Sequence, residues 1–181
     1  MIKCAKFVVL LFPLGLQGKI WQAILQSQGI SVIWESPDIQ FLQSIQHLQK
    51  THATLPDLLL LDTRLQPLRP YALCRWCRDR APELKVILCN GGQTQIITAE
   101  KQWAMAQGAA ELMPRFQQDA LISNAVVRIQ PVLKLLDCPY LDHRALVSAL
   151  LKIKPRHHRS GVLSFPPGPL NLKVEAGAPQ I

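Results

Sequence analysis

Four consecutive leucines, Leu58–Leu61, run directly into Asp62 in the stretch PDLLLLDTRLQP. Side chains of a β-strand alternate between its two faces, so an unbroken apolar run suits a strand that is covered on both faces. Helices must then lie above and below the sheet, and this run therefore predicts a parallel sheet in an α/β protein. A carboxylate at the end of such a strand is costly to bury unless a partner or a function compensates for it.

Strand-like apolar runs alternate with segments of helical periodicity over the first 136 residues. Strands are predicted at 6–12, 30–34, 58–61, 86–89 and 111–113. Helices are predicted at 19–28, 36–50, 71–80, 98–107 and 118–136, with Pro131 expected to kink or divide the last one. Five alternations of this kind predict a doubly wound, five-stranded parallel sheet. Functional residues of such sheets collect at the carboxyl ends of the strands, where Asp62 and Asn90 are expected.

The chain divides into a core and two C-terminal segments. Its 181 residues are 49% hydrophobic and 18% charged, which is enough apolar material for one well-formed core. We expect the αβ core to span residues 1–136 and a helical extension to span 137–154, with an amphipathic helix at Leu141–Ile153. Residues 155–181 contain five prolines and three glycines without a sustained period, and are expected to form a disordered tail.

The net charge of +8 is unevenly distributed. One basic cluster follows the predicted extension and contains Lys152, Lys154, Arg156 and Arg159. A second group of arginines follows Asp62 in the sequence and contains Arg64, Arg69, Arg75, Arg78 and Arg80. Such groups usually form a solvated face or a basic tail, and nucleic-acid binding through the C-terminal cluster is the alternative. No DNA-binding domain follows the core, so the sequence does not favour a nucleic-acid partner.

The N-terminus and the cysteines bear on the compartment. Two lysines precede an apolar run within Met1–Gly18, as in a signal peptide, but Pro13 interrupts the run and a buried first strand fits better. No apolar run reaches the ~18 residues that a membrane span needs. The five cysteines, an odd number, indicate reduced thiols and a soluble, cytoplasmic protein.

The spacing C-x-x-C occurs once, at Cys74 and Cys77. It lies inside a predicted helix, where residues i and i+3 share one face, so we interpret both thiols as core packing. Zinc binding with His157 and His158 is the alternative, but the spacing differs from that of zinc fingers. We therefore predict no metal site.

Three stretches carry a resemblance to a known family. They are PDLLLLDTRLQP at the third predicted strand, ELKVILCNGG at the fourth and QGAAELMPRF at the fifth. In this order and spacing, Lys3–Leu136 resembles a response-regulator receiver domain. The resemblance implies a flavodoxin-like or CheY-like fold, with Asp62 at the phosphoacceptor position and with Asn90 and Arg115 at the switch positions.

The chain departs from the receiver pattern where the metal should bind. Receivers need Mg²⁺ for phosphoryl transfer, and an acidic pair at the end of the first strand supplies its ligands. Phe12 and Pro13 stand there, and no Asp or Glu precedes Glu35. Glu35 and Asp38 are the nearby acids that could substitute.

The switch positions also depart from the pattern. Asn90 replaces a hydroxyl residue, Arg115 replaces a lysine, and Phe116 stands where proline is usual. Without the metal pair, we expect Arg115 to form an ion pair with Asp62 that locks the switch.

These departures predict a pseudo-receiver: a signalling module, not an enzyme, that binds another protein without Mg²⁺-dependent phosphorylation. The partner would be a histidine kinase or a downstream regulator, and the resemblance implies a docking surface that includes Trp103, Gln107, Arg115 and Phe116. No cofactor is expected, and Mg²⁺ would bind only if Asp62 is an active acceptor. The alternatives are a working phosphorelay receiver phosphorylated on Asp62, nucleic-acid binding, and a small apolar ligand of the quinone type.

Overall fold

The computed structural model describes residues 6–35, 41–51, 53–66, 68–138 and 140–153. Its centre is a sheet of five parallel strands in the order β2-β1-β3-β4-β5. The strands are β1 (Phe7–Leu11), β2 (Ser31–Glu35), β3 (Leu58–Asp62), β4 (Lys85–Asn90) and β5 (Glu111–Pro114). The predicted doubly wound α/β fold is confirmed, and the segment that resembled a signal peptide contains β1, which lies between β2 and β3.

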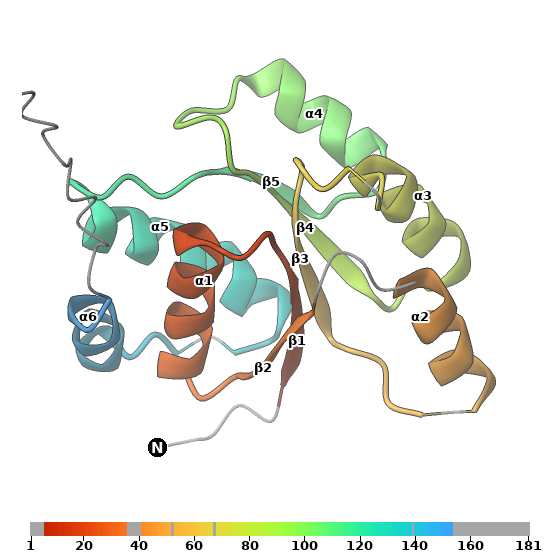
Figure 1. Cartoon of the computed structure of the whole chain (residues 1–181), viewed down its shortest axis with the longest axis horizontal. Helices are drawn as coiled ribbons and strands as arrows, with labels where there is room; N and C mark the ends of the chain where they lie inside the picture. The colour runs from red at the N-terminus through yellow and green to blue at the C-terminus, as the bar shows by residue number, and fades with distance from the viewer. Residues whose placement is uncertain (1–5, 36–40, 52, 67, 139, 154–181) are drawn as a thin grey trace, which may run out of the picture.

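Helices cover both faces of the sheet (Figure 1). They are α1 (Leu16–Ser27), α2 (Phe41–Lys50), α3 (Pro70–Arg80), α4 (Thr98–Ala106), α5 (Leu121–Leu135) and α6 (His143–Leu151). Helices α1, α5 and α6 lie on one side, whereas α2, α3 and α4 lie on the other. Two hydrophobic clusters correspond to these two layers.

The leucines of β3 divide between the two layers as the sequence predicted. Leu58 and Leu60 pack in the cluster beneath α1 and α5, whereas Leu59 and Leu61 pack against α2 and α3, and all four are 0% exposed. Full burial of such a side chain stabilises the fold by about 1.5–3 kcal/mol. Because strand side chains alternate, the next even-numbered residue, Asp62, faces the α1–α5 layer.

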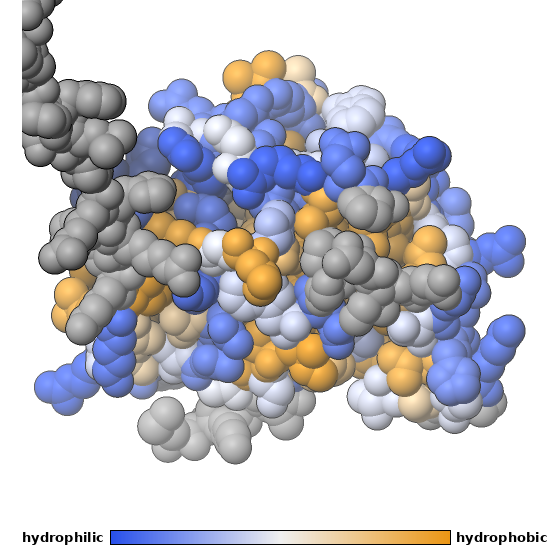
Figure 2. Space-filling view, in the orientation of Figure 1, coloured by the Kyte–Doolittle hydropathy of each residue, from blue (hydrophilic) through white to orange (hydrophobic). Residues whose placement is uncertain are grey.

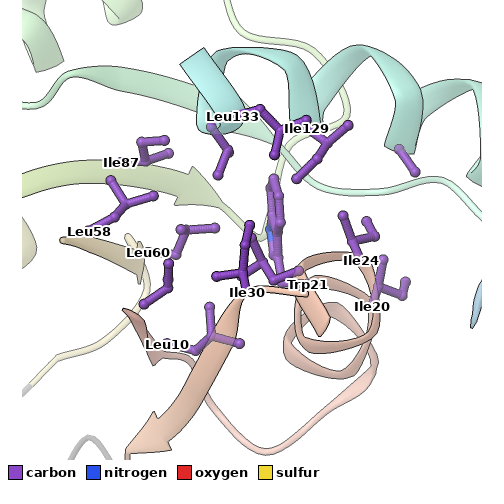
Figure 3. Close-up of a cluster of buried hydrophobic side chains, with 14 of the residues drawn as sticks. Leu10, Ile20, Trp21, Ile24, Ile30, Leu58, Leu60, Ile87, Ile129 and Leu133 are labelled. Carbon is purple, nitrogen blue, oxygen red and sulfur yellow. The ribbon is translucent and has the colours of Figure 1, made fainter. Parts of the chain in front are cut away.

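Trp21 is the largest side chain at the centre of the α1–α5 layer. It is 1% exposed and stands between α1 and the α5 residues Ile129 and Leu133 (Figure 3). Its ring meets that of Phe116 edge to face, with 5.0 Å between centroids. This contact joins α1 to the segment that follows β5, next to the carboxyl edge of the sheet.

The predicted C-terminal helix is present as α6. Its N-cap, Asp142, accepts a hydrogen bond from the backbone N–H of Ala145 at 2.9 Å, which satisfies one free amide of the first turn. Leu146 and Leu150 are buried against the α1–α5 layer. The extension is thus packed on the core on the side of α1 and α5.

Pro131 does not divide α5, which is continuous from Leu121 to Leu135. The proline removes one amide donor, so the carbonyl of Val127, four residues earlier, loses its helical partner. Val127 is 66% exposed, so water can reach that side of the helix and the predicted break is avoided.

The cysteines contradict one prediction. Cys74, Cys77 and Cys89 are free and buried, but Cys138 is disulfide-bonded, so the prediction of reduced thiols is wrong at that position. Cys4 lies outside the described residues. The cytoplasmic location that we inferred from the cysteine count therefore remains a prediction with weaker support.

Several predictions fall outside the described residues or at their edge. The tail 155–181 lies outside, as do Asp38 and the basic residues Lys154, Arg156 and Arg159, whereas Lys152 is described and exposed. Within the part of the chain that the structure describes, no helix has the length and apolar character to cross a membrane.

Candidate functional site

Asp62 is buried at the end of β3 and paired with Arg64. Its carboxylate is 0% exposed, and the Arg64 guanidinium donates to both of its oxygens, from Nη2 to Oδ2 at 2.7 Å and from Nε to Oδ1 at 3.0 Å. The backbone N–H of Arg64 also donates to Oδ1, at 2.9 Å. This bidentate geometry is a strong form of arginine–carboxylate pairing. The hydrogen bond with Asp62 raises the pKa of Arg64, although burial partly opposes the shift.

The predicted ion pair between Asp62 and Arg115 is therefore wrong. The chain turns directly after β3, where the backbone N–H of Leu65 donates to the carbonyl of Asp62 at 3.3 Å. This turn brings Arg64, only two residues away, back over the carboxylate. A cation so close in sequence loses less chain entropy on pairing than one from the far side of the sheet.

Gly91 makes room for the Arg64 side chain. A Cβ atom at this position would lie 2.3 Å from Nη2 of Arg64 and 2.5 Å from its Cζ. Gly91 directly follows β4, the neighbour of β3 in the sheet. The pair thus depends on the absence of a side chain directly after the adjacent strand, as well as on the arginine itself.

Apolar residues fill the end of β1, where the metal ligands of a receiver would lie. Phe12 is 1% exposed and packs in the α1–α5 layer, and its carbonyl accepts a hydrogen bond from Nε1 of Trp34 at 3.0 Å. The Trp34 ring lies against α1 at Gly18, where a Cβ would come within 2.4 Å of it. The space next to Phe12 is therefore occupied by aromatic rings rather than by oxygen ligands.

The described donors do not fit a magnesium site. Glu35 pairs with Leu11 in the β1–β2 register and does not line the cavity around Asp62. Among the described residues, no group of three or more His, Cys, Asp or Glu side chains is placed to hold a metal ion. The oxygens of Asp62 are already bonded to Arg64, whereas Mg²⁺ demands nearly octahedral oxygen ligands.

Asn90 shapes a loop and does not contact the carboxylate. Its Oδ1 accepts from the backbone N–H groups of Gly92 at 3.0 Å and Gln93 at 3.2 Å, and its Nδ2 donates to the Gln93 side chain at 2.9 Å. The backbone N–H of Arg115 donates to the Gln93 carbonyl at 2.8 Å, which ties the loop after β4 to the end of β5. The two predicted switch positions are thus joined through Gln93.

Phe116 belongs to the core, so its predicted place on a docking surface is wrong. It is 3% exposed, and its backbone is held by the side chain of Gln17, which donates to the Phe116 carbonyl at 3.1 Å and accepts from its N–H at 2.7 Å. The Phe116 ring packs edge to face against the buried Trp21 ring, and this contact favours a place in the core.

Two of the other predicted docking residues lie on or next to α4, and the third is at the site. Trp103 is 52% exposed and meets Tyr71 edge to face, with 4.4 Å between centroids. Gln107, at the end of α4, accepts a hydrogen bond from Arg75 of α3. Arg115 is exposed and lines the cavity with Asp62.

A cavity of about 840 Å³ opens at the carboxyl edge of the sheet. It brings together Asp62 and Arg115, as the sequence predicted for this edge, and adds Arg64 and Asp119. Its apolar wall comes from the β1–α1 loop, in which Leu14 is 93% exposed. The site is thus a cavity lined by the Asp62–Arg64 ion pair, in which the arginine neutralises the charge of the carboxylate.

Arg128 is a buried cation that the sequence reasoning missed. It is 9% exposed, its Cζ lies 4.8 Å from the centre of the Phe116 ring, and its Nη1 has no hydrogen-bond partner within the described segments. Burial lowers its pKa. A signal was present in the sequence, because Arg128 falls on the apolar stripe of α5 with Ala125, Ile129 and Val132.

The C-x-x-C pair behaves as packing. Cys74 and Cys77 are at most 1% exposed, and burial raises the pKa of each thiol to about 12. A reactive cysteine needs a lowered pKa and access, and these two thiols have neither.

Comparisons with known proteins give likenesses in structure only. No model of a protein family matches the chain, and no curated protein matches it in sequence. A response regulator receiver protein from Burkholderia phymatum is 21% identical with a TM-score of 0.54, over 73% of this chain and 95% of that one. The signal receiver domain of a protein assigned as a Luxo repressor in Vibrio parahaemolyticus is 13% identical with a TM-score of 0.55, over 83% and 99%.

These matches establish the fold. The chain has the CheY-like fold of response-regulator receiver domains, and it covers nearly the whole length of both solved domains. At such low identity, function has to be argued from the site itself.

Proposed function

We propose that this protein is a signalling module of the receiver type that works as a pseudo-receiver: it binds another protein and is not phosphorylated on Asp62 through Mg²⁺. The observation that carries the proposal is that Arg64 occupies both oxygens of the carboxylate. The receiver-like fold and the position of Asp62 at the end of β3 support the first part, and the surroundings of Asp62 support the second.

Phosphoryl transfer needs a free acceptor oxygen and a cation that bridges it to the incoming phosphate. At this site, Oδ2 of Asp62 would have to lose its hydrogen bond with Nη2 of Arg64, and Oδ1 would have to lose its hydrogen bond with Nε. The end of β1 supplies Phe12 and a proline instead of carboxylates for the metal. The state described therefore supports the proposal on two separate grounds.

The partner-binding function is supported by the surface of α4. Trp103 is 52% exposed on α4, and the helix and its N-cap also expose Met105 and Ile97, which are 49% and 64% exposed. Figure 2 shows apolar side chains over α4 at the top of the view, among hydrophilic ones. Exposed apolar side chains of this size commonly mark interaction sites. A histidine kinase or a downstream regulator in the cytoplasm is the partner class that the receiver-like fold favours.

Phosphorylation is tested by intact mass after incubation with acetyl phosphate and Mg²⁺, with a working receiver domain in a parallel reaction. We expect a mass gain for the working receiver and none for this chain. Asp62→Asn is the matched control, because it removes the acceptor and nearly preserves the shape. A mass gain in the wild type that disappears in Asp62→Asn would refute the proposal and establish the alternative, a working phosphorelay receiver.

A further inference from the structure

Three hollows meet at one residue, Gln118. The cavity around Asp62 shares Leu16 and Gln118 with a second hollow of about 150 Å³, which also reaches Ile20 and Ile153. A third hollow, of about 540 Å³, shares Gln118 and Leu121 with the second and lies between the start of α5 and the end of α6. We call the second and third hollows the α5–α6 groove; it connects the end of α6 with the cavity around Asp62.

Apolar side chains line this groove and stand exposed along it. Leu121 and Leu150 form its walls, and Ile122 and Leu151 are 40% and 73% exposed beside them. Apolar surface is visible where α1 and α5 meet, on the left of Figure 2. Exposed leucine and isoleucine side chains along linked pockets are typical of an interaction surface.

The described chain ends inside the groove. Ile153 lines the second hollow and packs against the α1–α5 core, so the residues that follow start from the groove itself. The next eight residues, 154–161, are mostly basic and polar, and residues 162–165 then read Val-Leu-Ser-Phe between a glycine and a proline. Eight residues can span at most roughly 29 Å, which is enough to turn back to any of three hollows that share Gln118.

We propose that residues 162–165 bind in the α5–α6 groove of their own chain. Pro166 favours an extended conformation for Phe165, and in an extended segment alternate side chains face the same way. Leu163 and Phe165 would therefore enter the groove together, and Val162 and Ser164 would face solvent. The bound segment would lie next to the cavity around Asp62, and its binding does not depend on whether Asp62 is phosphorylated.

The first test uses the full chain with the photo-crosslinking residue p-benzoylphenylalanine in place of Phe165, irradiated at low micromolar concentration. We expect a crosslink within one chain, to peptides that contain residues 118–123 or 150–153. The same residue in place of Lys173 is the control and should not give these crosslinks. Crosslinks between two chains would assign the groove to a second copy, and crosslinks elsewhere would place the segment on another surface; either result overturns the proposal.

The second test is hydrogen exchange on full-length variants. The N-cap of α5, Ala120, provides no side-chain hydrogen bond, so the first amides of that helix exchange rapidly unless something covers them. Leu163→Asp/Phe165→Asp should speed exchange in residues 120–123 about tenfold or more, whereas Val162→Asp/Ser164→Asp should change it less than about twofold. Equal rates in the wild type and in both variants would overturn the proposal.

Discussion

The substitution Arg64→Ala tests whether Arg64 neutralises a buried charge. It removes both side-chain hydrogen bonds to Asp62 and leaves the backbone N–H of residue 64, at 2.9 Å, as the remaining donor. The carboxylate is 0% exposed, so the variant leaves a buried acid group without its paired cation. The loss of that cation lowers the free energy of unfolding.

The expected loss is about 2–3 kcal/mol. Breaking a fully buried ion pair costs about 3–5 kcal/mol, because one charge remains without its partner. The Arg64 side chain is 51% exposed, so water can reach part of the carboxylate once the guanidinium is gone, and we reduce the figure accordingly. The loss is still a large share of the 5–15 kcal/mol that typically stabilises a domain.

Urea unfolding, followed by circular dichroism and tryptophan fluorescence at neutral pH, measures this loss. Arg78→Ala is the matched control: Arg78 pairs with Asp79 at 2.9 Å, but both side chains are about half exposed, so this substitution should lower the stability much less than Arg64→Ala does. Asp62→Asn added to Arg64→Ala should recover part of the stability by removing the buried charge. The reasoning is refuted if Arg64→Ala costs less than about 0.5 kcal/mol, or if Asp62→Asn lowers the stability further.

Three further substitutions or conditions test neighbouring features. Gly91→Ala should lower the free energy of unfolding by about 1–3 kcal/mol in the wild type, because the new Cβ displaces the Arg64 guanidinium, and by almost nothing in the Arg64→Ala background. Equal decreases in both backgrounds would contradict the coupling between Gly91 and Arg64. Burial raises the pKa of Cys74 and Cys77 to about 12, so the stability they contribute is complete below about pH 8.5 and falls as the pH rises toward 12. A urea midpoint that stays constant between pH 8 and 11, with alkylation of both thiols under native conditions, would contradict this. Arg128→Met keeps an unbranched side chain and removes a buried donor without a partner, so it should raise the free energy of unfolding by about 1 kcal/mol. A decrease of about 1 kcal/mol in the free energy of unfolding would instead show that the contact of Arg128 with the Phe116 ring outweighs the cost of desolvating the guanidinium.

The fold was predictable because its signals are local and repeated. The run Leu58–Leu61 indicated a strand covered on both faces, and each leucine lies in the layer that alternation assigns to it. Pro131 was predicted to kink or divide α5, and the division is wrong, because the helix continues through the proline on a partly exposed stretch. The sequence does not show where water can reach the helix.

The site was predictable only in part, because its contacts depend on neighbouring strands. The sequence placed Asp62 and Arg115 at one edge of the sheet, and both line the same cavity. Arg64 was assigned to a solvated basic group, since nothing in its own segment shows that Gly91 leaves space for it. The signal existed as a combination: an arginine two residues after a buried aspartate, and a glycine directly after the next strand.

The apolar end of β1 and the Asp62–Arg64 pair are consequences of one electrostatic requirement. A carboxylate that is 0% exposed needs a positive charge nearby, and in a working receiver a bound divalent cation can supply it. Phe12 leaves no oxygen ligands for such a cation at the end of β1. Arg64 supplies the charge from within the chain, and Gly91 gives it the space to do so. Restoring acidic residues at the end of β1 would therefore not be enough to create a magnesium site, because Arg64 would still compete with the metal for both oxygens of Asp62.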